Sequence, residues 1–201
     1  MKLVLASNNA KKLKELQALF QPIGLELVTQ GSLGIPEAEE PFDTFVENAL
    51  TKARHAARES GLPALADDSG LAVDALGGAP GVLSARYATL FGFEKSDAEN
   101  NRVLLDKLSG QTDRRARFVC ALVAVRSATD PEPLIAMGRW NGEILTAARG
   151  EAGFGYDPLM FIPSLGQSVA ELGAEQKNRL SHRALASEDL LRQMREAWHL
   201  G

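Results

Sequence analysis

Residues that bind soft metals or form disulfides are scarce in this sequence. Its 201 residues include one cysteine, Cys120, and three histidines, His55, His182 and His199. A single cysteine excludes an intrachain disulfide, and so few cysteines and histidines argue against a structural zinc cluster. A hard metal ion held by carboxylate oxygens is still compatible with this composition.

The chain also lacks a long apolar run and an excess of basic residues. No apolar stretch approaches the ~20 residues that a membrane-spanning helix needs, and the apolar start Met1–Ala6 is too short for a signal peptide. Lys and Arg number 22 against 26 Asp and Glu, and this net charge of −4 disfavours general nucleic-acid binding. We therefore expect a cytoplasmic protein with no membrane or nucleic-acid partner.

Hydrophobic patterning predicts one globular domain that combines helices with a β-sheet. The chain is 45% hydrophobic, and no linker or repeat divides residues 1–201. Asn141-Gly142 is a strong hairpin signal between two strand-like runs. The patterns predict strands at residues 3–6, 25–28, 64–66, 118–125, 134–140, 143–147 and 159–162, and helices at 11–20, 44–60, 97–108 and from about 181.

The segment between the first expected strand and the first expected helix is a candidate phosphate-binding site. Ser7–Lys12 reads Ser-Asn-Asn-Ala-Lys-Lys, and its small polar residues can cap the helix. Backbone N–H groups at a helix N-terminus attract anions, and Lys11 or Lys12 can reach a phosphate as a point charge. The segment is no Walker A loop, because Gly-Lys-Ser/Thr is missing. A capped helix with solvated lysines is the alternative interpretation.

Two adjacent carboxylates, Asp67 and Asp68, follow a short apolar strand. They repel each other unless a positive group lies between them or one is protonated. Mg²⁺ accepts such oxygen ligands, and it can bridge phosphates and activate a water molecule. Glu37, Glu39 and Glu40 add three carboxylates in the preceding loop. A turn with Asp–backbone hydrogen bonds, next to a solvated acidic loop, is the alternative.

A loop of alternating glycine and aromatic residues is a candidate base-binding element. Gly153–Pro158 reads Gly-Phe-Gly-Tyr-Asp-Pro. Glycine lets the backbone come close to a ligand, and an aromatic ring can stack on a base. A tight loop anchored by two buried aromatic side chains fits the same residues.

Two further polar groups have both a functional and an ordinary interpretation. Lys177 could bind phosphate, and His182 and Arg183 could donate hydrogen bonds to carbonyl oxygens of a planar ligand. On the helix expected at 44–60, Asn48 and Lys52 share one face. A solvated helix surface is the default interpretation of both groups when each is taken alone.

Seven motifs in a specific order resemble those of the inosine/xanthosine triphosphate pyrophosphatase family. The resemblance extends from Leu3 to about Leu191. The motifs are Ser-x-Asn-x-x-Lys at 7–12, Phe-x-Glu-Asn-Ala at 45–49 with Lys52 and Ala53, Ala-Asp-Asp-Ser-Gly-Leu at 66–71, Leu-Gly-Gly-Ala-Pro-Gly at 76–81, Ser-Ala-Arg-Tyr at 84–87, Gly-Phe-Gly-Tyr-Asp-Pro at 153–158 and Ser-His-Arg at 181–183.

The resemblance implies a fold and a reaction. The implied fold is α/β, with a long mixed β-sheet and α/β lobes on either side of a central nucleotide cleft, as in Maf-like proteins, and the chain would form a homodimer. The implied reaction is Mg²⁺-dependent hydrolysis of non-standard purine nucleoside triphosphates (dITP, ITP, XTP or dXTP) to the monophosphate and pyrophosphate. Its role would be to sanitise the nucleotide pool.

The resemblance also assigns roles to individual residues. Asp68 is implied as the general base or as a carboxylate that orients water, and as a Mg²⁺ ligand, with Glu39 or Glu40 completing the metal site. Ser69 and Lys177 are implied to contact the nucleotide. The triphosphate would be held by Ser7, Asn8, Asn9, Ala10, Lys11, Lys12 and Lys52, and the base by Phe154, Gly155, Tyr156, Asp157, His182 and Arg183, with Phe154 stacking on it.

Two other functions fit parts of the sequence. One is a Maf-like pyrophosphatase that acts on pyrimidine or modified nucleotides, and the other is a nucleotide-binding protein without catalysis. The Asp67-Asp68 pair favours an enzyme, because a binding protein has no need for a carboxylate that activates water.

Overall fold

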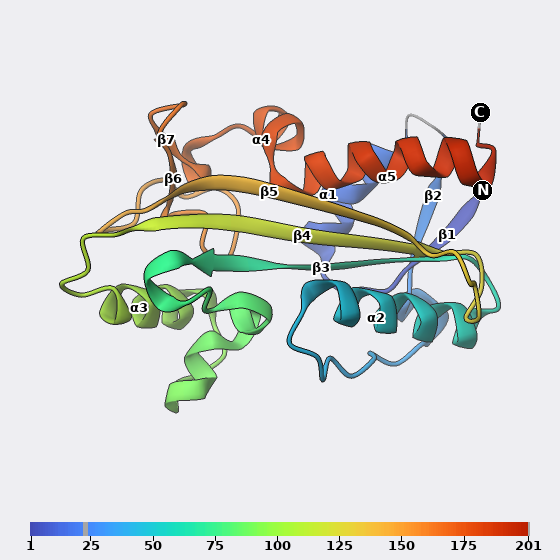
Figure 1. Cartoon of the computed structure of the whole chain (residues 1–201), viewed down its shortest axis with the longest axis horizontal. Helices are drawn as coiled ribbons and strands as arrows, with labels where there is room; N and C mark the ends of the chain where they lie inside the picture. Colours follow the sequence, from blue (N-terminus) through green and yellow to red (C-terminus); the bar gives the residue numbers. More distant parts are fainter. Residues whose placement is uncertain (22–23, 201) are drawn as a thin grey trace. The chain divides into compact units, whose positions relative to one another are not determined.

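The computed structural model describes residues 1–21 and 24–200. Strands and α-helices alternate in the first half of the chain, whereas the second half has a run of strands followed by two α-helices (Figure 1). The strands are β1 (Lys2–Leu5), β2 (Glu26–Thr29), β3 (Ala64–Val73), β4 (Arg115–Val125), β5 (Leu134–Ile144), β6 (Met160–Ile162) and β7 (Gln167–Ser168). The α-helices are α1 (Ala10–Phe20), α2 (Phe45–Ser60), α3 (Asp97–Lys107), α4 (Ala174–Leu180) and α5 (His182–Trp198).

The described strands form one mixed sheet in the order β2-β1-β3-β4-β5-β6-β7. β1 runs parallel to β2 and β3, whereas β6 is antiparallel to β5 and β7. This mixture of parallel and antiparallel pairs, together with the helices, confirms the predicted α/β class. Within the described ranges, no helix is long and apolar enough to cross a membrane.

The chain divides into two compact units. Unit 1 contains residues 1–21, 24–68, 120–138 and 181–200, and unit 2 contains residues 69–119 and 139–180. The three longest strands, β3, β4 and β5, each contribute residues to both units.

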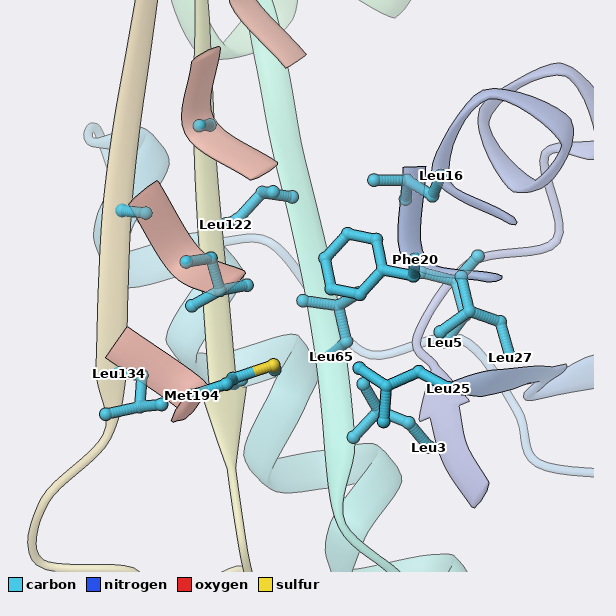
Figure 2. Packing of buried hydrophobic residues seen from close by; sticks show 14 of the residues in the cluster. Leu3, Leu5, Leu16, Phe20, Leu25, Leu27, Leu65, Leu122, Leu134 and Met194 are labelled. Atoms are coloured by element: carbon cyan, nitrogen blue, oxygen red, sulfur yellow. The ribbon is translucent and has the colours of Figure 1, made fainter. Parts of the chain in front are cut away.

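In unit 1, the first strands are buried on both faces. Leu3, Leu5 and Leu65 belong to a cluster with residues of α1 and α5, part of which is drawn in Figure 2. Val4 and Ala66 belong to a separate cluster that contains the alanine face of α2. Side chains alternate between the faces of a strand, so α1 and α5 cover one face and α2 the other. Burial on both faces explains why Leu3–Ala6 and Ala64–Ala66 are continuous apolar runs.

In unit 2, the core packs α3 against strand residues. Leu71 and Val73 of β3, Phe118 of β4 and Trp140 of β5 share one buried cluster with Leu104 of α3. This core supports the loop that contains Gly153–Pro158, because Tyr156 belongs to the same cluster.

The predicted starts of three helices are confirmed by their N-caps. The side chains of Asn9, Thr44 and Ser181 accept hydrogen bonds from backbone N–H groups in the first turns of α1, α2 and α5. Local capping chemistry of this kind can be read from sequence alone. The helix α4 and the short strand β7 were not predicted.

The hairpin predicted at Asn141-Gly142 is wrong. β5 continues through both residues as one strand, Leu134–Ile144. A Cβ atom on Gly142 would lie only 2.3 Å from the carbonyl oxygen of Phe161. Glycine is therefore needed at this position for the close approach of β6, and it makes no turn there.

The strand predicted at 64–66 is longer than expected. β3 runs from Ala64 to Val73, so Asp67 and Asp68 lie inside a buried strand and not in a turn. Their side chains consequently need partners within the protein, because buried charges are costly without them.

Candidate functional site

The turn between β1 and α1 is ordered by its own polar side chains. Asn9 Oδ1 accepts hydrogen bonds from the N–H groups of Lys11 and Lys12, at 3.0 and 3.1 Å, and Ser7 Oγ accepts one from Asn9 N–H at 3.1 Å. Asn8, Asn9, Ala10 and Lys11 are exposed, whereas Lys12 is partly buried. The segment thus has exposed polar side chains beside a helix N-terminus, where an anion can bind, but Asn9 already accepts from the N–H groups of Lys11 and Lys12.

Asp67 joins this segment to the start of α5. Its Oδ1 accepts a hydrogen bond from Lys12 Nζ at 2.5 Å, and its Oδ2 accepts one from Arg183 Nε at 2.8 Å. Burial alone would raise the pKa of Asp67, but the charges of Arg183 and Lys12 outweigh it and hold the pKa well below the ordinary value. Asp67 is therefore a buried anion.

Arg183 is itself buried, with 2% of its surface exposed. Besides Asp67, its guanidinium donates to Glu15 Oε2 of α1 at 2.5 Å. Cys120 Sγ lies 3.3 Å from Asp67 Oδ2, and burial raises the pKa of this thiol well above its usual value. Glu15 carries no recognisable local signal in the sequence, so only the fold identifies it as a partner of Arg183.

Asp68 forms a second charged cluster with residues around α2. Lys52 Nζ donates to Asp68 Oδ1 at 2.8 Å, to Glu40 Oε1 at 2.5 Å and to the carbonyl oxygen of Asp67 at 3.0 Å. Burial, with help from Glu40, raises the pKa of Asp68 despite the opposing charge of Lys52. Burial acts in the opposite sense on Lys52, but the two carboxylates outweigh it and raise the Lys52 pKa. The cluster holds two carboxylates around one ammonium group.

This cluster has an oxygen suited to a hard cation. Asp68 Oδ2 is buried and has no hydrogen-bond partner in the described part of the chain. Nowhere among residues 1–21 and 24–200 do three His, Cys, Asp or Glu side chains gather as a complete metal site. Mg²⁺ is commonly held by one or two carboxylates together with substrate phosphates, so Asp68 and Glu40 fit that ion. Glu39 is exposed, and it lines a cavity between its own loop and residues Thr51–Arg58 of α2.

In unit 2, Asp157 organises the loop at 153–158. Its Oδ2 accepts hydrogen bonds from Phe154 N–H at 2.9 Å and from Lys177 Nζ at 2.8 Å. Lys177 Nζ also lies 4.6 Å from the centre of the Phe154 ring, within cation–π range. These contacts bring together three of the predicted nucleotide-binding residues.

The same loop is held by residues that sequence reasoning missed. Asp97 Oδ2 accepts from Gly155 N–H at 2.8 Å, and Asn101 Nδ2 donates to the Gly155 carbonyl at 2.9 Å. Tyr156 is buried, and its hydroxyl donates to the carbonyl of Ser84 at 2.9 Å. Tyr156 thus anchors the loop, as the structural interpretation of this motif expected.

The remaining predicted residues occupy different environments. Ser69 is half-buried in β3, and Asn8 Nδ2 donates to Glu37 Oε1 at 3.1 Å. His182 begins α5 and is buried. A Cβ atom on Gly138 would lie 1.8 Å from the His182 carbonyl oxygen, so β5 needs glycine there to approach the start of α5.

Comparisons with known proteins confirm the predicted family and fold. A model of the Ham1 family matches residues 3–193. The chain is similar to the dITP/XTP pyrophosphatase of Leptothrix cholodnii, with 67% identity and 100% of both chains covered. It is also similar to the dITP/XTP pyrophosphatase of Paracidovorax citrulli, with 62% identity over 98% of this chain and 100% of the relative.

Solved structures agree with these relatives. A HAM1 protein from Coxiella burnetii has a TM-score of 0.90 and 46% identity, over 98% of this chain and 100% of that chain. A nucleoside-triphosphatase described as dITP/XTP pyrophosphatase, from Mycobacterium abscessus, has a TM-score of 0.75 and 42% identity, over 95% and 99%. The similarity extends over nearly the full length in each case.

Proposed function

The chain belongs to the Ham1 family, and from this premise we propose that it is a nucleoside triphosphate pyrophosphatase for non-standard purines. Its substrates would be dITP, ITP and XTP or dXTP, its products the nucleoside monophosphate and pyrophosphate, and its cofactor Mg²⁺. The names of its full-length relatives support this activity. The observation that carries the proposal is the buried Asp68 carboxylate. Its Oδ1 accepts a hydrogen bond from Lys52, and its Oδ2 has no hydrogen-bond partner among the described residues.

Asp68 is suited to the role of general base. A water molecule oriented by Asp68 would attack the α-phosphorus and transfer its proton to the carboxylate. The bond between the α-phosphorus and the bridging oxygen to the β-phosphate would break, and pyrophosphate would leave. Because burial raises the pKa of Asp68, the carboxylate is a better proton acceptor than an exposed aspartate.

Charge neutralisation is the second requirement of phosphoryl transfer. Two lysines can contribute to it: Lys12 ends the Ser7–Lys12 segment and pairs with Asp67, and Lys52 pairs with Asp68. Both are already balanced by carboxylates, so substrate phosphates would compete with Asp67, Asp68 and Glu40 for them. Mg²⁺ bound at Asp68 and Glu40 would neutralise phosphate charge. Of Glu39 and Glu40, we propose Glu40 as the second Mg²⁺ ligand, because it and Asp68 both accept hydrogen bonds from Lys52 Nζ.

Base selection is proposed to depend on hydrogen-bond donors and on stacking. Hypoxanthine and xanthine present an O6 acceptor where adenine presents an amino group, so donors from His182 or Arg183 would favour them. A mismatched buried polar edge costs about 1–3 kcal/mol. Phe154 would stack on the base, and Lys177 would contact the nucleotide from its position above that ring.

A nucleotide panel tests the proposal. The protein is incubated with ITP, XTP, dITP, ATP, GTP, dTTP and UTP, with and without Mg²⁺, and pyrophosphate and orthophosphate are measured separately. We expect pyrophosphate from the first three nucleotides and only with Mg²⁺. A preference for dTTP or UTP would instead indicate a Maf-like activity, and tight binding of ITP without pyrophosphate release would indicate a nucleotide-binding protein.

We propose that the chain forms a homodimer through a surface of unit 2. Leu90, Phe91 and Phe93 are 52%, 39% and 44% exposed. Exposed apolar groups of this size favour contact with another protein surface. Analytical ultracentrifugation of the purified chain tests the prediction, and we expect a dimer at micromolar concentration.

A further inference from the structure

The loop that contains Glu40 has little packing of its own. We call residues 36–43, which lie between Ile35 and the N-cap of α2, the carboxylate loop. All its residues except Ala38 and Glu40 are exposed, and Phe42 is 41% exposed. A cavity of about 500 Å³ lies between this loop and α2, lined on the helix side by Thr51, Arg54, His55 and Arg58. Apolar packing therefore cannot account for the position of Glu40.

Hydrogen bonds hold the carboxylate loop instead. Asn48 of α2 is 1% exposed, and its side-chain amide bonds to both backbone groups of Phe42. Its Oδ1 accepts from Phe42 N–H at 3.0 Å, and its Nδ2 donates to the Phe42 carbonyl at 2.9 Å. At the other end of the loop, His55 Nε2 lies 2.9 Å from the Pro36 carbonyl. Asn8 also donates to Glu37 Oε1, and Lys52 donates to Glu40 Oε1. Of the side chains that make these attachments, Asn48 is the one that is buried.

The position of Asn48 connects it to the proposed metal site. Phe42 is two residues from Glu40, and Lys52, which binds Glu40 and Asp68, lies one helical turn after Asn48 on the same face of α2. Residues behind a metal ligand orient it, and their loss weakens metal binding without removing a ligand. Without Asn48, a bound cation would have to order the carboxylate loop as well as contact Glu40.

We propose that Asn48 is a positioning residue that sets the metal affinity of the Asp68–Glu40 site by holding the backbone of Phe42. This inference rests on the proposed function, because it takes Asp68 and Glu40 as the Mg²⁺ ligands. It adds a role for a motif residue that touches neither the metal nor the nucleotide. It also gives a functional reason for a buried amide beside the buried alanine residues of α2.

The test uses two variants and one matched control. Asn48→Ala removes both hydrogen bonds to Phe42, and Asn48→Asp keeps the acceptor for Phe42 N–H but places a carboxylate oxygen against the Phe42 carbonyl. Asn100→Ala is the control, because Asn100 is also buried, at 2% exposure, and also bridges backbone groups, Ala88 N–H at 2.8 Å and the Ala85 carbonyl at 3.3 Å. Thermal melts establish how much each substitution destabilises the fold.

Metal affinity is measured in two ways. Mn²⁺ alone is titrated into the full chain by calorimetry, and the Mg²⁺ concentration for half-maximal ITP hydrolysis is determined separately. We expect both Asn48 variants to raise the Mn²⁺ Kd and the half-maximal Mg²⁺ concentration about 10- to 100-fold, with kcat recovering at saturating Mg²⁺. Asn100→Ala should keep the parent values even if its melting temperature falls as far.

Each outcome bears on a different statement. Parent-like metal affinity in either folded Asn48 variant overturns the positioning role and leaves the proposed function intact. An equal loss of metal affinity in Asn100→Ala also overturns it, because the effect would then follow stability alone. A parent protein that hydrolyses ITP equally well without a divalent cation refutes the metal assignment itself. If Asn48→Ala does not fold, the milder Asn48→Asp decides by the same criteria.

Discussion

Arg183 Nε donates a hydrogen bond to Asp67 Oδ2 at 2.8 Å, although the two residues are 116 positions apart in the chain. Both side chains are buried, and Lys12 supplies a second cation to the same carboxylate. These two ion pairs therefore connect the first turn of α1, the middle of β3 and the start of α5 inside unit 1. Five predictions test this network and the proposed nucleotide site.

Substitution of Asp67 tests how much this ion pair stabilises the fold. Removing one member of a buried pair typically costs about 3–5 kcal/mol, because the other charge stays buried without its partner. We expect Asp67→Asn to lower the free energy of unfolding by that amount at pH 7, measured by urea denaturation. Asp113→Asn is the exposed control, since Asp113 pairs with Arg115 on the surface, and it should change stability little.

The stability difference should depend on pH in one direction. Arg183 and Lys12 overcome the effect of burial and hold the folded-state pKa of Asp67 well below that of the unfolded chain, which is about 4. Ionised Asp67 thus stabilises the protein fully above pH of about 4, and this contribution is lost as the pH falls towards the folded-state value. The gap between parent and Asp67→Asn should shrink in that acidic window. A gap that widens there would contradict the depressed pKa.

Asp68→Asn tests the general base. The substitution keeps the size of the side chain but removes proton acceptance, so we expect kcat for ITP to fall about 10²- to 10⁴-fold. The fold should persist, because Lys52 retains Glu40 as a partner. Pyrophosphate release is the measurement, and Asp74→Asn, which loses exposed pairs with Arg117 and Arg115, serves as control. Parent-like turnover in Asp68→Asn would exclude the proposed role.

Gly138→Ala tests the packing at the start of α5. The added methyl group would meet the His182 carbonyl at 1.8 Å, whereas a Cβ on Gly173 would meet nothing within 4 Å. Because the His182 carbonyl is part of the backbone and cannot rotate away as a side chain can, this overpacking should lower the free energy of unfolding by about 1–3 kcal/mol. We also expect weaker discrimination between ITP and ATP, since His182 is displaced. Thermal melts and the ratio of kcat/KM values check both effects, with Gly173→Ala as the matched substitution.

Phe154→Leu tests base stacking. Loss of the aromatic face should cost about 1–3 kcal/mol of nucleotide binding, seen as a higher KM for ITP with kcat largely kept. Phe161→Leu is the comparison, because Phe161 also has a cation near its ring, Arg149 at 5.6 Å, but was not assigned to the base. An unchanged KM in Phe154→Leu would argue that the ring serves only to pack Lys177.

The sequence predicted features that depend on neighbours along the chain. The starts of α1, α2 and α5 were predictable, because an N-cap such as Asn9, Thr44 or Ser181 bonds only to the backbone of its own first turn. The ordered motifs predicted the family, which the comparisons confirm. The same local reasoning failed at Asn141-Gly142, where the glycine makes room for the Phe161 carbonyl from another strand.

The amino-acid sequence by itself determined the α/β class, the main helices and the set of candidate residues, because periodicity, capping and motif order are local properties. Only the tertiary structure decided which of those residues touch. Glu40 shares the Lys52 ammonium group with Asp68, and Arg183 pairs with both Asp67 and Glu15. Asn48 bonds to the backbone of the carboxylate loop. The physical reason is that buried charges and amides must be satisfied by partners brought from distant segments, and no local pattern names those partners.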